Sequence, residues 1–229
     1  MRPEKREKTG LGKKKELVRP AESEKTEEIR EKEMSGGSER GKRGRETREV
    51  SEGGEKMQKI LIVVDMQNDF IDGSLGTKEA VAIVDNVIAE IAKYDTKDIF
   101  ATRDTHPENY LETQEGKNLP VVHCVKGTDG WQINEKVKTA LKDAVVIDKP
   151  TFGSKILAEE ITKIAEKEDI TVTLVGLCTD ICVVSNAILI KAYLPEIPVK
   201  VIASCCAGVT PESHEAALAT MRMCQVQVE

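Results

Sequence analysis

The chain has 229 residues and a formal net charge of −6, and its charges are unevenly distributed. Residues 1–56 hold 17 Lys and Arg and 14 Asp and Glu with almost no large apolar residues, so we expect a disordered charged extension. Residues 57–229 hold 17 basic and 26 acidic residues, a balance that argues against nucleic acid as the main partner. Two other readings of the first segment stay open: a nucleic-acid arm, or sequence upstream of a start at Met57.

The remaining 173 residues suit one compact domain. No stretch is long and apolar enough to span a membrane, and the N-terminal segment lacks the apolar core of a signal peptide. We therefore expect a cytoplasmic protein with no membrane partner, in which the cysteines remain free thiols. The six cysteines are Cys124, Cys178, Cys182, Cys205, Cys206 and Cys224.

From Met57 onward, apolar runs typical of buried strands alternate with stretches of helical spacing. The expected strands are 59–64, 97–102, 144–147, 170–175, 199–203 and 224–228. The expected helices are those capped by Thr77, Ser154 and Thr210 (with Pro211 next), the stretch 133–141, and the run that follows Cys182. This order predicts an α/β fold with three α/β/α layers and a six-stranded, mainly parallel sheet, Rossmann-like in architecture.

Ionisable side chains fall where these strands end. Asp65, Asp104 and Lys149 follow or end the first three strands, and Cys182 follows the fourth. The carboxyl ends of parallel strands share one edge of a sheet, so the four groups can converge. Singly, each charge suits a solvated loop, and the cysteine suits a buried core position; together they indicate a reactive site.

The chemistry of such a group is acyl transfer. A lysine ammonium stabilises a thiolate and lowers its pKa. An aspartate can accept the thiol proton and return it to a leaving amine. The backbone amides of Cys178 and Cys182 can receive the oxyanion of a tetrahedral intermediate.

A long polar loop from Thr105 to about Gly130 suggests a second constellation, because loops of this length in a compact domain are usually functional. Asp104, His106 and His123 are residue types that ligate a divalent metal and leave positions for water or substrate. Their spacing in the sequence does not match a short metal-binding motif. For the third histidine, His214, we expect a structural hydrogen bond near the start of the last helix.

Four stretches of the sequence resemble motifs of the isochorismatase-like cysteine hydrolases, and within that family they resemble the nicotinamidases. They are Val63–Phe70, Arg103–Pro107 with Pro120–Thr128, Asp148–Ser154, and Gly176–Val183. The resemblance runs from Met57 to the C-terminus and leaves residues 1–56 unmatched.

The resemblance implies a catalytic triad of Asp65, Lys149 and Cys182, with a cis peptide between Leu177 and Cys178 that turns the Cys178 N–H into the oxyanion hole beside that of Cys182. It also implies hydrolysis of nicotinamide to nicotinate and ammonia through a thioester, as in NAD salvage, with Phe70 stacked on the ring. A divalent metal, zinc or else manganese or iron, would bind the pyridine nitrogen. The partners implied are this small-molecule amide and further copies of the chain in a homo-oligomer.

Two departures from the family pattern leave the substrate open. Tyr110 stands where many nicotinamidases have another histidine ligand, so Glu115, or as second choice Glu112, is expected to complete the metal site. The family often has a Trp where this chain has Pro120, preceded by Leu119. The alternatives are a related cysteine hydrolase of another small amide or ureido compound or of isochorismate, and, from another class, a non-catalytic binding or scaffold protein.

Overall fold

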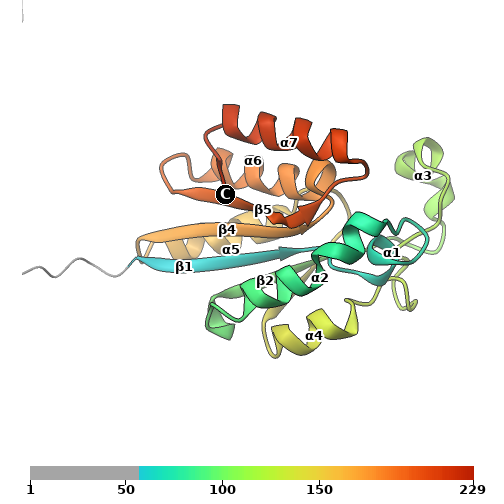
Figure 1. The fold of residues 1–229 in the computed structure, drawn as a ribbon, viewed down its shortest axis with the longest axis horizontal. Helices are drawn as coiled ribbons and strands as arrows, with labels where there is room; N and C mark the ends of the chain where they lie inside the picture. The colour runs from blue at the N-terminus through green and yellow to red at the C-terminus, as the bar shows by residue number, and fades with distance from the viewer. Residues whose placement is uncertain (1–56) are drawn as a thin grey trace, which may run out of the picture. The chain divides into compact units, whose positions relative to one another are not determined.

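The computed structural model describes residues 57–229, which form one α/β unit (Figure 1). The predicted disordered extension, residues 1–56, lies outside the described residues. Six strands form one sheet in the order β3-β2-β1-β4-β5-β6, and every neighbouring pair is parallel, which confirms the predicted sheet. The strands are β1 (Gln58–Val64), β2 (Ile99–Asp104), β3 (Val145–Lys149), β4 (Ile170–Leu177), β5 (Val199–Ala207) and β6 (Gln227–Val228).

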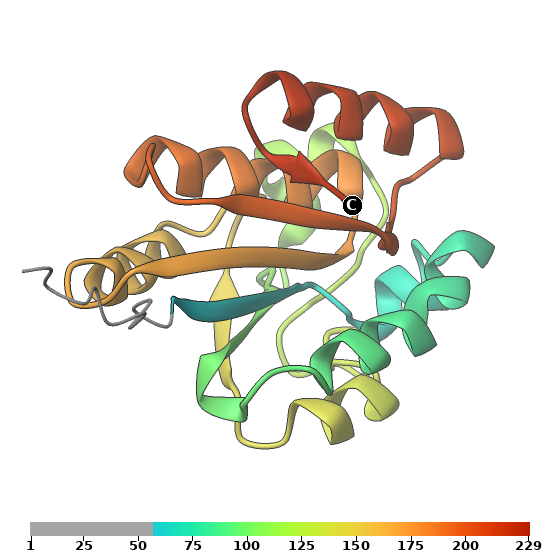
Figure 2. The same ribbon diagram turned by 60° about the vertical axis from the view of Figure 1, so that its left-hand side comes forward.

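Helices cover both faces of the sheet, so the predicted three layers are present (Figures 1 and 2). The helices are α1 (Asn68–Ile71), α2 (Lys78–Ile91), α3 (Gln114–Asn118), α4 (Glu135–Leu141), α5 (Lys155–Ala165), α6 (Val184–Tyr193) and α7 (Pro211–Met223). Apolar residues of α2 and α4 pack on one face, and those of α5, α6 and α7 pack on the other. Burial of both faces explains why the strands read as nearly unbroken apolar runs. Among the described residues, no helix is both long and apolar enough to cross a membrane.

Three predicted helix starts are confirmed by their caps. The side chain of Thr77 accepts a hydrogen bond from the backbone N–H of Ala80, and that of Ser154 accepts one from Leu157. The Thr210 hydroxyl accepts from the N–H of Ser213 with Pro211 at the first helical position. Each cap pairs a backbone donor that the first turn of a helix leaves unsatisfied.

Several element boundaries differ from the prediction. Strand β2 runs over Ile99–Asp104 in place of 97–102, and β4 and β5 continue past their predicted ends to Leu177 and Ala207. The last strand is only Gln227–Val228, because α7 continues to Met223 and the chain turns at Gln225 with a φ of 66°. The stretch 133–141 becomes helical only at Glu135, where Asn134 provides the cap. The third strand continues beyond the predicted end at Ile147 to Lys149.

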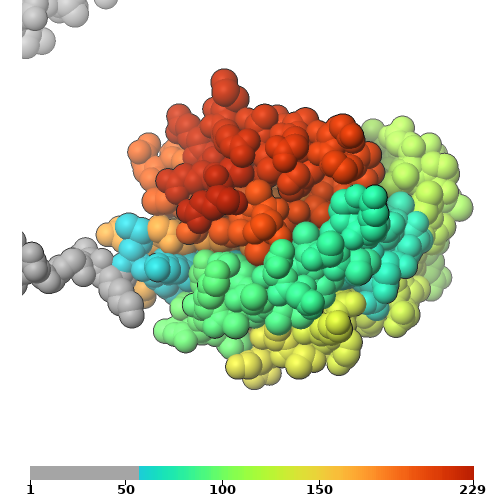
Figure 3. Space-filling model, in the orientation of Figure 1, coloured from blue at the N-terminus to red at the C-terminus, as the bar shows by residue number. Residues whose placement is uncertain are grey.

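The extension of β2 and β3 matters for the site. In the register of these two strands, Asp104 is the direct partner of Lys149. The carboxyl ends of the strands point to the end of the molecule that carries α1 and α3 (Figure 1). Figure 3 shows α3 and its neighbouring loop as part of the surface at this end.

Gly176 allows β4 to lie close against β1 where the two strands end. Its φ is 114°, a conformation that L side chains rarely adopt, and a Cβ atom there would lie 2.1 Å from the carbonyl oxygen of Val64. Only glycine fits a position with both restrictions. The chain that leads to Cys182 therefore depends on this residue.

Replacing Gly176 with Ala should lower the free energy of unfolding by about 3 kcal/mol, since a left-handed backbone costs about 1–2 kcal/mol and overpacking about 1–3 kcal/mol. The matched control is Gly127→Ala, because Gly127 also has a positive φ (88°) but open space around its Cβ position. That control should cost only about 1 kcal/mol. Urea unfolding followed by Trp131 fluorescence measures both values, and equal losses would contradict the close-approach argument.

Candidate active site

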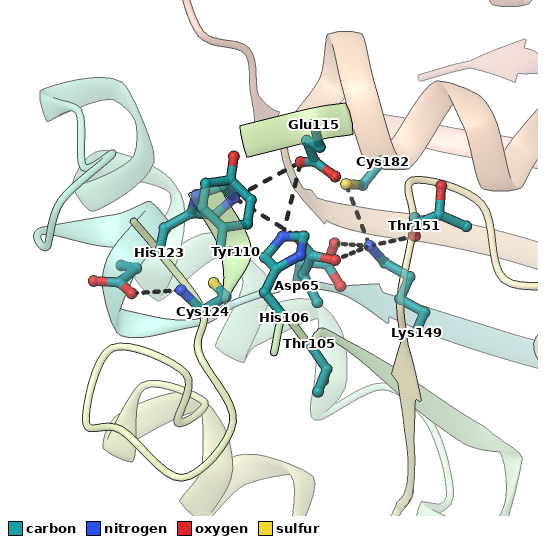
Figure 4. Close-up of polar contacts among 12 residues, drawn as sticks. Asp65, Thr105, His106, Tyr110, Glu115, His123, Cys124, Lys149, Thr151 and Cys182 are labelled. Carbon is teal, nitrogen blue, oxygen red and sulfur yellow. Dashed lines mark hydrogen bonds and ion pairs between the residues drawn. The ribbon is translucent and has the colours of Figure 1, made fainter. Parts of the chain in front are cut away.

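Four side chains that are far apart in the sequence meet at the carboxyl edge of the sheet, and Figure 4 labels three of them, Asp65, Lys149 and Cys182. Asp65 follows β1 directly, with a φ of 45°. Asp104 and Lys149 end β2 and β3. Cys182 lies in a π-helical turn, Thr179–Val183, between β4 and α6. All four side chains are buried, and an unusual backbone conformation at Asp65 is typical of functional positions.

The ammonium of Lys149 lies at the centre of this group. Its Nζ atom is 2.7 Å from Asp65 Oδ2, 3.4 Å from Asp104 Oδ1 and 3.4 Å from Cys182 Sγ. It also donates a hydrogen bond to the carbonyl oxygen of Thr151, at 3.1 Å. Burial lowers the pKa of Lys149, but the neighbouring carboxylates outweigh burial and hold this pKa above its ordinary value. The side chain is therefore a cation at neutral pH.

Asp65 is placed to exchange a proton. Its Oδ1 atom accepts a hydrogen bond from the Thr102 hydroxyl at 2.7 Å. Its Oδ2 atom is buried and lies 2.7 Å from the ammonium of Lys149. Burial raises the pKa of Asp65, and the charge of Lys149 opposes that rise. A buried carboxylate close to a thiol can act as a general base.

The thiol of Cys182 is buried, and its surroundings favour its protonated form. Burial raises its pKa most, the Asp65 carboxylate raises it further, and Lys149 lowers it; the pKa ends well above the ordinary value. The effect of the lysine could be predicted from the sequence, whereas burial and the two carboxylates, which outweigh the lysine, could not. A nucleophilic thiolate at this position therefore needs a base to take the proton, and the nearby carboxylate is Asp65.

The turn before Cys182 has the backbone that the resemblance implied. The peptide bond between Leu177 and Cys178 is cis. Cys178 lies at the N-cap position of the π-helical turn, and burial raises the pKa of its thiol to about 12. The two cysteines therefore have different surroundings. Cys182 faces Lys149, whereas Cys178 lies four residues earlier, where β4 ends.

A second cluster lies beside the first. Asp104, His106, Glu115 and His123 each offer one atom, and these four atoms lie within 4.8 Å of one another. Two imidazole nitrogens and two carboxylate oxygens, mostly buried, form a donor set that suits zinc, manganese or iron. Glu115, in α3, belongs to this cluster, whereas Glu112 accepts a hydrogen bond from the exposed side chain of Asn109.

The two histidine rings are held by neighbouring groups. The Nδ1 atom of His123 lies 2.8 Å from the carbonyl oxygen of Val121, so its Nδ1–H donates there and Nε2 faces the cluster. His106 Nε2 lies 3.0 Å from Asp104 Oδ2. Burial is the largest effect and lowers the pKa of His106. The hydrogen bond and charge of Asp104, together with the charge of Glu115, outweigh burial, so the net pKa lies above its ordinary value.

Tyr110 packs against the two histidines of this cluster. Its ring packs against His106 and His123 at centroid distances of 4.7 and 4.9 Å. Its hydroxyl donates to the carbonyl oxygen of Leu119, at 2.9 Å. The side chain that stands at the family's histidine position therefore orients the histidine rings.

The two clusters open into one cavity of about 750 Å³. Its lining includes Phe70, Asp104, His123, Cys178 and Cys182, so the proposed ring-stacking residue lines the same cavity as the thiol. Apolar side chains of Leu119, Phe152 and Val209, each more than a third exposed, also line it. A cavity of this size that combines apolar walls with convergent polar and charged groups is typical of small-molecule sites.

Trp131 does not line the cavity. The guanidinium of Arg103 lies 3.4 Å from the centroid of its rings, and the indole N–H donates to the Thr105 hydroxyl. This tryptophan supports the loop outside the cavity and does not replace the one that the family often has.

Several supporting residues escaped the sequence argument. Thr102 bonds the base candidate Asp65, and the buried amide of Gln67 pairs with both the N–H and the carbonyl of Asp104. Asn186, in α6, hydrogen-bonds both the carbonyl of Cys182 and the loop 150–154 that follows Lys149, called the lysine loop below. The one sequence feature that could have pointed to them is a polar residue within an otherwise apolar run. The expected structural hydrogen bond of His214 is present, between its Nδ1 and the hydroxyl of Thr179 at 2.8 Å.

Fold and site together define an α/β protein with a buried Asp–Lys–Cys group beside four side chains of metal-ligand type. The model of the Isochorismatase domain matches residues 59–229, and the chain belongs to this family.

The relatives agree with this assignment. The nicotinamidase/pyrazinamidase of Mycobacterium tuberculosis is 28% identical over 185 residues, which cover 74% of this chain and 97% of that protein. The pyrazinamidase of Pyrococcus horikoshii, solved in complex with zinc, superposes with a TM-score of 0.62 at 29% identity and covers 75% of this chain and 98% of its own. The N-carbamoylsarcosine amidase of Thermoplasma acidophilum gives 0.58 at 25% identity, covering 76% and 96%.

Replacing Lys149 with Met should slow the alkylation of Cys182 by iodoacetamide about tenfold near pH 7, because losing the ammonium raises the pKa of the thiol and lowers the thiolate fraction. Alkylation rates rise with pH below the thiol pKa, so the pH curve of the variant should lie at higher pH than that of the wild type. Peptide mass spectrometry measures the rate, with exposed Cys224 as the internal reference.

The control for this experiment is Lys126→Met, which removes an exposed lysine near Asp148 and should leave the rate at Cys182 unchanged. An unchanged rate in Lys149→Met would remove the proposed role of the ammonium.

Replacing Glu115 with Gln should weaken zinc binding at least about tenfold, because the cluster loses a charged ligand. Glu112→Gln is the matched control: it makes the same chemical change three residues away, outside the cluster, and should bind zinc like the wild type. Competition with a chromophoric chelator measures both dissociation constants. Equal affinities for the two variants would exclude Glu115 as a ligand.

Proposed function

We propose that this chain is a metal-assisted cysteine amidase that hydrolyses nicotinamide to nicotinate and ammonia. The observation that carries the proposal is the position of Lys149, 2.7 Å from Asp65 and 3.4 Å from Cys182, because Cys182 lines a cavity that also reaches Asp104 and His123. Support also comes from the Mycobacterium tuberculosis relative, which is named a nicotinamidase/pyrazinamidase.

The first half of the reaction forms a thioester. Asp65 takes the proton of the Cys182 thiol, and the thiolate attacks the carbonyl carbon of the amide. The backbone N–H groups of Cys178 and Cys182 stabilise the resulting oxyanion. As the tetrahedral intermediate collapses, protonated Asp65 gives its proton to the leaving nitrogen, the C–N bond breaks and ammonia leaves.

The second half reverses these proton transfers. Asp65, again a carboxylate, removes a proton from water, and the hydroxide attacks the thioester carbonyl. The C–S bond breaks, the acid product forms, and the proton on Asp65 returns to the Cys182 sulfur. Throughout, the ammonium of Lys149 stabilises negative charge on the sulfur and keeps Asp65 oriented.

The residues of the second cluster fit a bound divalent ion. Asp104, His106, Glu115 and His123 would hold it. When bound, such an ion supplies a Lewis acid for the ring nitrogen of a pyridine carboxamide, which orients the amide toward Cys182. Phe70 would contact the face of the ring from the cavity wall.

A second candidate is a related hydrolase of another small amide or ureido compound. Leu119, and no tryptophan, lines the cavity near the metal cluster, so the wall is less specific for a flat aromatic ring. The Thermoplasma acidophilum neighbour is an N-carbamoylsarcosine amidase by name.

Incubation of the full chain with nicotinamide and zinc or manganese should release ammonia, and Cys182→Ala should reduce the release to background. Benzamide, which has the same ring size but no ring nitrogen, should react at least about tenfold more slowly because it lacks the metal ligand. Cys224→Ala, an exposed thiol away from the cavity, is the control and should keep full activity.

A coupled ammonia assay measures all these rates. No ammonia from nicotinamide, or undiminished release from Cys182→Ala, would refute the proposal. Release from a ureido compound alone would favour the second candidate.

A further inference from the structure

A buried amide side chain lies one helical turn beyond the candidate nucleophile. Asn186, in α6, is 1% exposed. Its Nδ2 donates to the carbonyl oxygens of Cys182 (2.8 Å) and Phe152 (3.1 Å), and its Oδ1 accepts from the backbone N–H of Ser154 (2.9 Å). Two carbonyls and one N–H around the amide permit only this orientation, because the flipped amide would face oxygen with oxygen.

These partners belong to two different elements of the site. Phe152 and Ser154 lie in the loop that follows Lys149, and the Lys149 ammonium itself donates to Thr151 in that loop. Cys182 lies in the turn that leads into α6. Asn186 therefore bonds the lysine loop directly to the carbonyl group of the nucleophile.

The sheet provides no such direct link. Lys149 ends β3 and the Cys182 turn follows β4, and these strands are separated by β2 and β1 in the sheet. Each has backbone partners of its own, as in the bond from the N–H of Thr105 to the carbonyl of Lys149. Asp65 and Asp104 hold the ammonium at the strand ends, and its separation from the sulfur depends further on how the loop docks on α6.

Packing agrees with this docking. A Cβ atom on Gly153 would be in ordinary van der Waals contact with Leu189 and with the carbonyl oxygen of Ser185, both in α6. The loop therefore lies against the helix surface along the turn that follows Cys182.

We propose that Asn186 is a positioning residue that sets the 3.4 Å separation between Lys149 Nζ and Cys182 Sγ by holding the loop 150–154 on α6. It touches no reacting atom and acts through the lysine. The inference rests on the proposed function only in assigning Cys182 as the nucleophile. Misplacement of a reacting group by about 1 Å can cost about a hundredfold in rate, so such a link matters for the chemistry.

The test measures alkylation of Cys182 by iodoacetamide from pH 6 to 10 in the full chain, for wild type, Asn186→Leu, Lys149→Met and the double variant. This readout needs no substrate and no metal, so it stands even if nicotinamide is not hydrolysed. Asn186→Leu should slow the rate about tenfold at pH 7 and displace the pH curve upward, since the ammonium no longer lies beside the sulfur. The rate at Cys224 should stay constant.

The double variant separates positioning from general destabilisation. If Asn186 acts through Lys149, then Asn186→Leu has no further effect once Lys149 is Met. Ile190→Ala is the matched control, because it removes buried volume one turn further along the same helix and away from the loop. It should lower Tm without changing the rate at Cys182.

With nicotinamide, Asn186→Leu should lower kcat while KM changes less than about threefold, which is the pattern of a lost transition-state interaction. An unchanged alkylation rate, additive effects in the double variant, or an equal effect of Ile190→Ala would overturn the proposal. If Asn186→Leu does not fold, Asn186→Ser, too short to bridge Phe152 and Ser154, replaces it in the same cycle.

Discussion

The buried ion pair between Lys149 and Asp65 is the interaction on which the rest of the site depends. Both side chains are fully removed from solvent. Removing two charges from water costs several kcal/mol per ion unless close partners compensate. Here the Thr102 hydroxyl, the Thr151 carbonyl and the Asp104 carboxylate provide those partners. The pair is stable only where three strand ends and one loop are already in place, so the site and the fold form together.

The same pair connects the two clusters. Lys149 contacts Asp104, and Asp104 also contacts His106 on its other oxygen. The pKa of Asp104 is lowered overall: burial raises it, but the hydrogen bond from His106 and the charge of Lys149 lower it more. One carboxylate therefore belongs to the thiol chemistry and to the candidate metal site. With Glu115 added, the cluster has more negative than positive groups, which suits a divalent cation.

Much of the fold could be predicted from the sequence because its signals are local. A Thr or Ser before a helical run caps the helix whatever surrounds it, as at Thr77, Ser154 and Thr210. Apolar runs separated by helices require a covered parallel sheet. The boundaries that differed, at Lys149 and at Gln227, depend on which strand lies alongside, and that information is not local.

For the site, the sequence by itself determined which residue types stand at the strand ends, and through them the membership of Asp65, Lys149 and Cys182 in one group. It also limited the fourth metal-ligand candidate to Glu115 or Glu112. The tertiary structure decided between those two, because only the fold of the 105–130 loop brings α3 over the histidines.

The tertiary structure also decided the ionisation of Cys182 and the role of Asn186. Burial and the approach of two carboxylates raise the thiol pKa, and these depend on distances between segments more than a hundred residues apart in the case of Asp65. Asn186 is an ordinary helix residue in the sequence, and its three hydrogen bonds exist only because the lysine loop docks on α6. The chemistry that depends on residue type can be predicted from the sequence. Shifts in pKa that depend on proximity and desolvation arise only when the chain has folded.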